Sequence, residues 1–235
     1  SCRYGFHIFE QHDLSTYAIT LESCKAYNTT DYAILINKTG TGVRVKGLKI
    51  IGGYFEIVRG SRVLQIENAF GTMENVAIAC KSNTGFARML NLDNANVEID
   101  GLTIDLVSYQ AANPRLFGLN NRSRTQVKGL KVKFGDSTSN LILDGDGSDT
   151  YADIEIIESD QSANLASNVP NYWIKSLTDQ IPIMSVYQDL NANDQVPNIS
   201  RNACDEIYLR LRAVGGNRDV GVFPFGHHRG QKLYI

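Results

Sequence analysis

The chain has 235 residues, of which 43% are hydrophobic, and a formal net charge of −2 at pH 7. This length suffices for one large domain or two smaller ones, each with a hydrophobic core. The nearly balanced charge does not favour binding to nucleic acid or to an anionic membrane surface, and no apolar run approaches the roughly 20 residues that span a bilayer. Because the chain begins with Ser1 instead of Met, we expect a piece of a longer protein.

A short strand-like segment recurs six times between residues 21 and 156. It reads LESCKA at 21–26, VKGLKI at 45–50, MENVAI at 73–78, IDGLTI at 99–104, VKGLKV at 127–132 and YADIEI at 151–156. The third residue of each copy is small or tolerant of turns, and these residues are Ser23, Gly47, Asn75, Gly101, Gly129 and Asp153. The alternation of apolar and polar residues in the copies predicts a strand with one buried face.

A second strand-like segment lies between these copies. It reads AILIN at 33–37, VLQIEN at 63–68, MLNLDN at 89–94, LFGLNN at 116–121 and LILDG at 141–145. The last apolar residues of these segments, at Ile36, Ile66, Leu92, Leu119 and Leu143, follow one another at intervals similar to those of the first segment. Two independent columns with a similar interval indicate a repeated unit of about 26 residues.

This unit predicts an all-β fold, a parallel β-helix of about six coils over residues 1–158. Leucine-rich repeats have a similar length but require an LxxLxLxxN pattern that this chain lacks, and a propeller blade needs about 40–45 residues. In such a stack each coil is stable only against its neighbours.

The repeat pattern ends near residue 158. Residues 159–170, SDQSANLASNVP, are polar and rich in turn residues, so we expect a linker there. Residues 171–235 contain strand-like runs such as DEIYLRLRAV but lack the 26-residue interval. We therefore expect a separate, non-repeating C-terminal β region that caps the helix or mediates oligomerisation.

Acidic residues recur directly after the second segment. Glu67 follows Ile66 and Asp93 follows Leu92, so the two carboxyls are expected on adjacent coils, about 5 Å apart. Such proximity raises the pKa of one carboxyl, and retaining glycosidases hold two carboxyls about 5–5.5 Å apart. Asp144 continues the predicted row, roughly 10 Å from Asp93, which is near the wider spacing of inverting enzymes. A solvated row of turn residues is the alternative.

Three arginines begin the second segment in successive units. Arg62, Arg88 and Arg115 are 26 and 27 residues apart, and stacked guanidinium groups repel one another unless anions lie among them. Glu56 or the acidic row would supply those anions in a purely structural interpretation. The alternative is a cleft for an acidic polysaccharide, because arginine binds carboxylates in a bidentate fork.

Two tyrosines follow the repeat glycines at similar distances. Tyr54 and Tyr109 are candidates for a platform on which sugar rings stack, with turn or core packing as the alternative. The chain contains no P-loop, HExxH, GxSxG or GxGxxG motif. We therefore expect neither a metal site nor a cofactor.

The recurring VxGLxI strand, the Asn/Asp/Gly turns and the non-repeating segment after them resemble bacteriophage tailspike proteins over residues 4–158. The resemblance implies a right-handed parallel β-helix, an architecture that pectin-degrading enzymes and polysaccharide lyases share. It also implies a homotrimer of the virion tail that binds and hydrolyses bacterial surface polysaccharide, either capsule or O-antigen. The balanced charge and the lack of a long apolar run predict no nucleic-acid partner and no membrane insertion. Two alternatives stay open, a non-catalytic receptor-binding or adhesin module, secreted or at a cell surface, and a lyase acting on uronic-acid polymers.

Overall fold

The chain folds as a parallel β-solenoid of about five turns. The computed structural model describes residues 2–10, 18–38, 45–59, 62–81, 87–106, 113–135, 140–147, 149–161, 163–169, 171–177, 184–190, 206–213 and 232–234. Every regular element in these ranges is a β-strand, which confirms the predicted all-β, parallel architecture. Within the same ranges there is no helix with the length and apolar character needed to cross a membrane.

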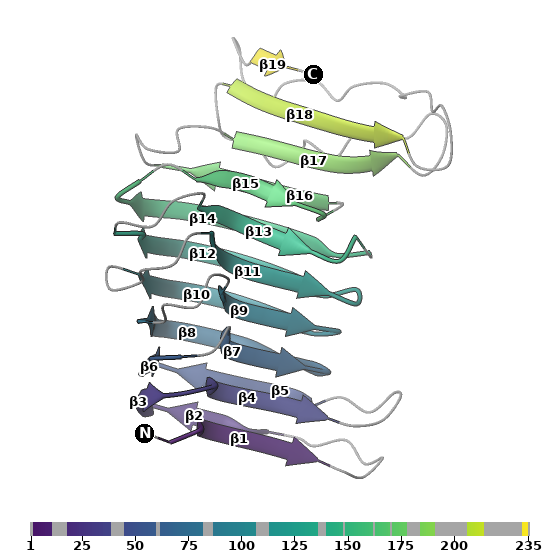
Figure 1. Cartoon of the computed structure of the whole chain (residues 1–235). Coiled ribbons are helices and arrows are strands. Elements are labelled where there is room, and N and C mark those ends of the chain that lie inside the picture. Colours follow the sequence, from purple (N-terminus) through teal and green to yellow (C-terminus); the bar gives the residue numbers. More distant parts are fainter. Residues whose placement is uncertain are drawn as a thin grey trace.

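Two sheets form the walls of the solenoid, and over residues 4–176 the strands of one sheet run opposite to those of the other, while successive coils rise from the N-terminus to the C-terminus (Figure 1). The first sheet contains, in spatial order, β1 (Tyr4–Glu10), β4 (Tyr32–Lys38), β7 (Arg62–Glu67), β9 (Ala87–Asp93), β11 (Pro114–Asn120), β13 (Leu141–Gly145) and β15 (Asn164–Ser167). All its neighbouring strands are parallel.

The second sheet runs the whole length of the stack. Its strands, again in spatial order, are β2 (Thr20–Glu22), β5 (Val45–Ile51), β8 (Ala69–Cys80), β10 (Asn96–Asp105), β12 (Arg124–Lys133), β14 (Tyr151–Ser159), β16 (Asn171–Ser176), β17 (Met184–Leu190), β18 (Glu206–Ala213) and β19 (Lys232–Tyr234). Beside this path, β6 (Tyr54–Ile57) pairs with both β3 (Lys25–Thr29) and β8.

The predicted inward columns are confirmed in the central coils. Leu102 lies opposite Val76 on one side and Leu130 on the other, and none of the three is more than 2% exposed. The columns Met73/Ile99/Val127 and Ile78/Ile104/Val132 are likewise in register. Burial of these aliphatic columns between the two sheets is the main stabilising contribution that the repeat provides.

The predicted alignment fails at both ends of the repeat. Val127 lies opposite Ile154 instead of Tyr151, because β12 and β14 pair here at an offset of 27 residues (Arg124 opposite Tyr151), whereas the alignment of the copies assumed 24. Ile50 lies opposite Met73 instead of Ile78, because β5 and β6 together occupy the length of the single strand β8. Residues that the sequence alignment treats as equivalent in these copies therefore do not lie opposite one another in the core.

A bend in the second sheet explains the recurring small residue. Ser23, Gly52, Asn75, Gly101 and Gly129 all have φ between 52° and 73°, and the register places them at equivalent positions of successive coils, directly after β2 and β5 and within β8, β10 and β12. This left-handed conformation is open to glycine and tolerated by asparagine, but it is costly for most other residues. In the coil of β5 the bend uses Gly52, whereas the sequence alignment had placed Gly47 in this column.

The parallel stack continues past residue 158. β15 lies within residues 159–170, the expected linker, and pairs with β13, so this segment forms part of a coil. β16 pairs in parallel with β14 and sets Trp173 opposite Asp153. β15 follows β13, and β16 follows β14, after fewer than 26 residues, so the search for a 26-residue interval did not detect these two strands. The pairing of β16 with β17 is antiparallel, and the strands described beyond it, β18 and β19, extend the second sheet.

Candidate functional site

The expected carboxylate pair is present at the C-terminal ends of two neighbouring strands. Glu67 on β7 and Asp93 on β9 lie directly in register, and both are half-buried. Glu67 Oε1 accepts a hydrogen bond from Gln65 Nε2 at 2.9 Å, and Asp93 Oδ1 accepts one from Asn121 Nδ2 at 2.7 Å. On the next strand, β11, the row continues with Asn120 opposite Asp93.

The environment favours the protonated form of Glu67. Burial raises the pKa of its carboxyl, and the negative charge of Asp93 raises this pKa further. The hydrogen bond from Gln65 and the positive charge of Arg62 lower it, but the net shift is upward. Glu67 is therefore suited to hold a proton and deliver it as a general acid.

Asp144 does not belong to this row, and the predicted row was wrong at this point. It lies opposite Gly118, which in turn lies opposite Asn91, so Asp144 is aligned with a residue two positions before Asp93. The misalignment arose because Leu143 lies opposite Phe117, whereas the repeat pattern had paired it with Leu119.

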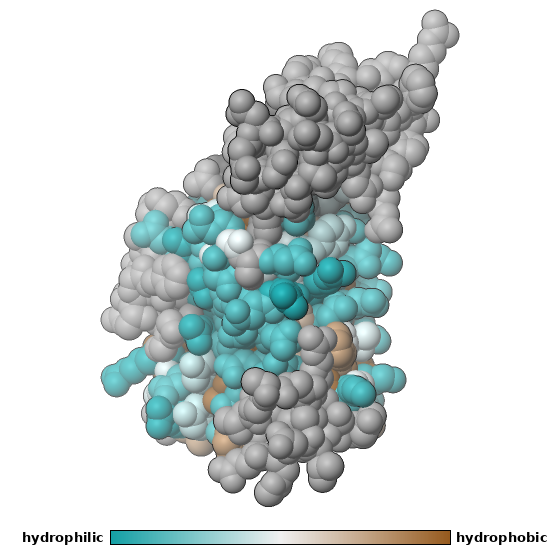
Figure 2. Space-filling view, turned by 90° about the vertical axis from the view of Figure 1, so that its right-hand side faces the viewer, coloured by the Kyte–Doolittle hydropathy of each residue, from teal (hydrophilic) through white to brown (hydrophobic). Residues whose placement is uncertain are grey.

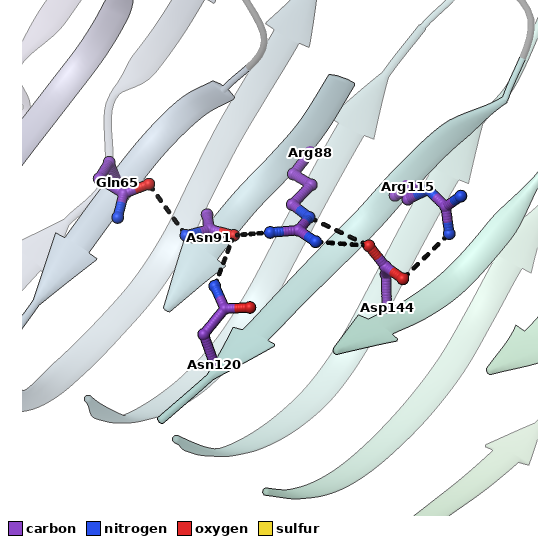
Figure 3. Close-up of polar contacts among 6 residues, drawn as sticks. All are labelled: Gln65, Arg88, Asn91, Arg115, Asn120 and Asp144. Atoms are coloured by element: carbon purple, nitrogen blue, oxygen red, sulfur yellow. Dashed lines mark hydrogen bonds and ion pairs between the residues drawn. The ribbon is translucent and has the colours of Figure 1, made fainter. Parts of the chain in front are cut away.

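Asp144 is the anion that pairs with two of the three stacked arginines, Arg88 and Arg115 (Figure 3). Arg88 donates to Asp144 Oδ2 from Nε at 3.1 Å and from Nη2 at 2.7 Å, and Arg115 Nη1 lies 3.1 Å from Asp144 Oδ1. The side chains of Arg88, Arg115 and Asp144 are only 17%, 25% and 8% exposed. The structural interpretation of these two arginines is thus supported, although Glu56, one expected partner, pairs instead with Lys81 at 2.9 Å.

Arg88, Arg115 and Asp144 form a largely buried triad, and amide side chains connect this triad to the carboxylate pair of Glu67 and Asp93. Arg88 Nη1 donates to Asn91 Oδ1 at 3.0 Å, and Asn91 Nδ2 donates to Gln65 Oε1 at 2.9 Å. Gln65 must then present its NH₂ group to Glu67, because its carbonyl oxygen is already engaged by Asn91. Asn120 Nδ2 also reaches Asn91 Oδ1, at 3.3 Å. The contacts form a continuous chain from Asp144 to Glu67, which orients the Glu67 carboxyl.

Sequence reasoning missed Gln65 and Asn91, although a signal for them exists. Both are less than 3% exposed, and they occupy equivalent positions of VLQIEN and MLNLDN, 26 residues apart. A polar residue that repeats in the middle of an apolar segment indicates a buried side-chain ladder, because buried amides require hydrogen-bond partners.

Gly118 gives the Arg88 side chain its path to Asp144. A Cβ atom added at Gly118 would lie 2.4 Å from Arg88 Cδ and 2.4 Å from Asn91 Oδ1. Because glycine has no side chain, Gly118 on β11 leaves room for Arg88 on β9 to reach Asp144 on β13.

Arg62 lies in register with Arg88, as predicted, and Arg88 with Arg115. Among the described residues, no hydrogen bond or ion pair of the Arg62 guanidinium is present, and its charge acts on Glu67.

Tyr54 lies on β6, and its hydroxyl donates to Glu56 Oε2 at 2.9 Å. Burial and this hydrogen bond to Glu56 raise the pKa of Tyr54 to about 12. Its ring centroid is 5.2 Å from that of Tyr27, which is 53% exposed. Tyr54 is thus one half of an aromatic pair that reaches the surface. Tyr109 lies outside the described residues.

A scan against models of protein families, a search of curated proteins and a search of solved structures each found no match for this chain.

Proposed function

We propose that the chain binds a bacterial surface polysaccharide, capsule or O-antigen, and hydrolyses it in the manner of a phage tailspike. The observation that carries this proposal is the in-register pair of Glu67 and Asp93, in which the pKa of Glu67 is raised. Protonated Glu67 would deliver its proton to the glycosidic oxygen, and the Asp93 carboxylate would act on the anomeric carbon, directly or through a water molecule.

The strand spacing favours the direct attack. Residues in register on neighbouring strands are about 4.8 Å apart, which is close to the carboxyl separation of about 5–5.5 Å in retaining glycosidases. In that mechanism Asp93 forms a covalent bond to the sugar while the leaving oxygen takes the proton from Glu67. Glu67 then removes a proton from the water that releases the sugar.

The surface around the strand ends supports a carbohydrate ligand. Figure 2 views the molecule from the side toward which the first-sheet strands point in Figure 1, and hydrophilic residues cover most of the described surface there. Hydrogen-bonding side chains at this edge suit a polyhydroxylated polymer better than an apolar ligand.

A non-catalytic binding module is the second candidate, favoured by the amide partners of the two carboxylates. Gln65 donates to Glu67 and Asn121 donates to Asp93, as expected for ladders that only stabilise the stack. The lyase interpretation has less support, because Arg88 and Arg115 are engaged by buried Asp144 and are poorly placed to act as bases. Assembly as a homotrimer in a virion tail is the remaining part of the proposal, and its support is the resemblance to tailspikes.

The test is incubation of the protein with a panel of purified capsular and O-antigen polysaccharides, followed by mass spectrometry of the products. Hydrolysis adds the mass of one water molecule for each linkage cleaved. A lyase would produce an unsaturated sugar that absorbs ultraviolet light, and a binding module would leave the polymer intact. Sedimentation of the same sample tests the homotrimer.

A further inference from the structure

A pocket of about 270 Å³ opens at the edge where the first sheet turns into the second. Its aromatic and polar lining consists of Phe70, Asn94, Asn96, Arg122, Arg124 and Asp149. Asn94, one of the lining residues, directly follows Asp93 in the chain. The volume of the pocket is near the lower end of the range for small-molecule sites, which suits a single sugar unit.

Turns of increasing length build the walls of this pocket. One residue separates β7 from β8, two separate β9 from β10, three separate β11 from β12, and five separate β13 from β14. Phe70 follows the shortest turn, whereas Arg122 and Asp149 lie within the two longest.

The turn that carries Arg122 is strained and held in place. Asn121 and Arg122 both adopt the left-handed conformation, with φ of 49° and 63°, which costs free energy for a residue such as arginine. Asn121 is fixed from two sides, because its Nδ2 donates to Asp93 and its backbone N donates to Asp146 Oδ2 at 3.0 Å. A fixed turn lowers the entropy cost of binding a ligand at Arg122.

Phe70, Asn96 and Arg124 lie side by side on β8, β10 and β12. Asn96 and Arg124 are exposed, and no hydrogen bond or ion pair of their side chains with another residue of the described part of the chain is present. Arg122 and Arg124 together outweigh the single negative charge of Asp149, so the lining carries net positive charge. The pocket thus combines guanidinium donors, an amide and one aromatic ring.

We propose that this pocket binds a carboxylate-bearing sugar unit, a uronic acid, of an anionic polysaccharide. The guanidinium fork matches the two oxygens of a carboxylate, Asn96 would bond sugar hydroxyls, and the Phe70 ring would cover the apolar face of the pyranose. The proposal builds on the proposed polysaccharide function and names the polymer class. It also moves the acidic-polysaccharide hypothesis from Arg88 and Arg115, which Asp144 occupies, to Arg122 and Arg124.

Calorimetric titration with D-glucuronate, D-glucose and D-glucose 6-phosphate tests the proposal. We expect glucuronate to bind at least about tenfold more tightly than glucose, because hydrogen bonds between charged groups are stronger than those between neutral groups. The affinity for glucuronate should also fall with rising salt concentration. Equal affinity for glucuronate and glucose, or tighter binding of the sugar phosphate, would overturn the assignment of a uronic acid.

Two matched variants test where the ligand binds. Arg124→Gln should weaken glucuronate binding about tenfold or more, whereas Lys128→Gln, which removes the same charge from an exposed position of the same strand outside this pocket, should leave it unchanged. Thermal melting checks that both variants fold, and Phe70→Leu should weaken binding without any change in charge. Equal effects of Arg124→Gln and Lys128→Gln would contradict the proposal.

The outcomes separate this inference from the proposed hydrolysis. Glucuronate binding that requires Arg124, in a protein that cleaves no polymer, would support the pocket and contradict the hydrolase. Polymer cleavage without glucuronate binding would support the hydrolase and contradict the pocket.

Discussion

Arg88 on β9 donates two hydrogen bonds to Asp144 on β13, at 3.1 and 2.7 Å, across the intervening strand β11. One side chain thus links three successive strands of the first sheet. Backbone ladders join only neighbouring coils, so this contact adds a longer-range connection to the stack.

Removal of Asp144 should destabilise the protein strongly. Asp144→Ala leaves Arg88 and Arg115 without their shared, largely buried counter-charge, and breaking a buried ion pair in this way costs about 3–5 kcal/mol. Urea unfolding measures the change. Glu158→Ala, which removes a pair with Lys131 whose two side chains are about half exposed, is the control and should cost less than about 1 kcal/mol. Similar losses in both variants would mean that the triad has no special structural role.

A methyl group at Gly118 should disturb the same network. Gly118→Ala places a Cβ against Arg88 Cδ and Asn91 Oδ1, and overpacking of this kind costs about 1–3 kcal/mol. Because Arg88→Ala removes one of the two clashing atoms, the double variant should lose less stability than the sum of the single variants. A double-mutant cycle on unfolding free energies measures this coupling. Strict additivity would show that Arg88 does not pass over Gly118 in solution.

The raised pKa of Glu67 predicts a pH dependence of stability. A carboxyl whose pKa is higher in the folded state than in the unfolded state binds its proton more tightly when folded. Its stabilising contribution is complete at pH values below the ordinary glutamate pKa and is lost as the pH rises through the raised pKa. The stability of wild type relative to Glu67→Gln should therefore fall between about pH 4 and pH 7. A difference that stays constant, or grows, over this range would contradict the raised pKa.

The sequence predicted the fold better than it predicted the site, and particular residues show why. Leu102 was placed correctly because its column repeats with both the strand period and the coil interval. Asp144 was misplaced because Gly145 occupies the position opposite Leu119 where the pattern expects an apolar residue, and a Cβ there would lie 3.0 Å from Val169 Cγ2. When a neighbouring side chain fills the space of a missing one, a one-dimensional pattern aligns to the wrong residue.

Polar contacts between strands could be predicted only where the two residues are separated by one repeat interval. The adjacency of Glu67 and Asp93 follows from a 26-residue interval, so it could be predicted. The contact of Arg88 with Asp144 spans 56 residues and requires the gap above Gly118, so it could not. The pocket at Arg122 and Arg124 was missed because it depends on differences between turn lengths, whereas a repeat search looks for what the coils share.

The most direct test of the proposed hydrolase is the rate at which Glu67→Gln and Asp93→Asn cleave the bacterial polysaccharide that the wild-type protein degrades. Both substitutions keep the shape of the side chain and remove its acid–base or nucleophilic chemistry. We expect each variant to bind the polymer with nearly unchanged affinity and to cleave it roughly 10²-fold more slowly or worse, the usual scale for loss of a positioned acid or base. Wild-type rates in both variants would contradict the assignment of this carboxylate pair as the catalytic site.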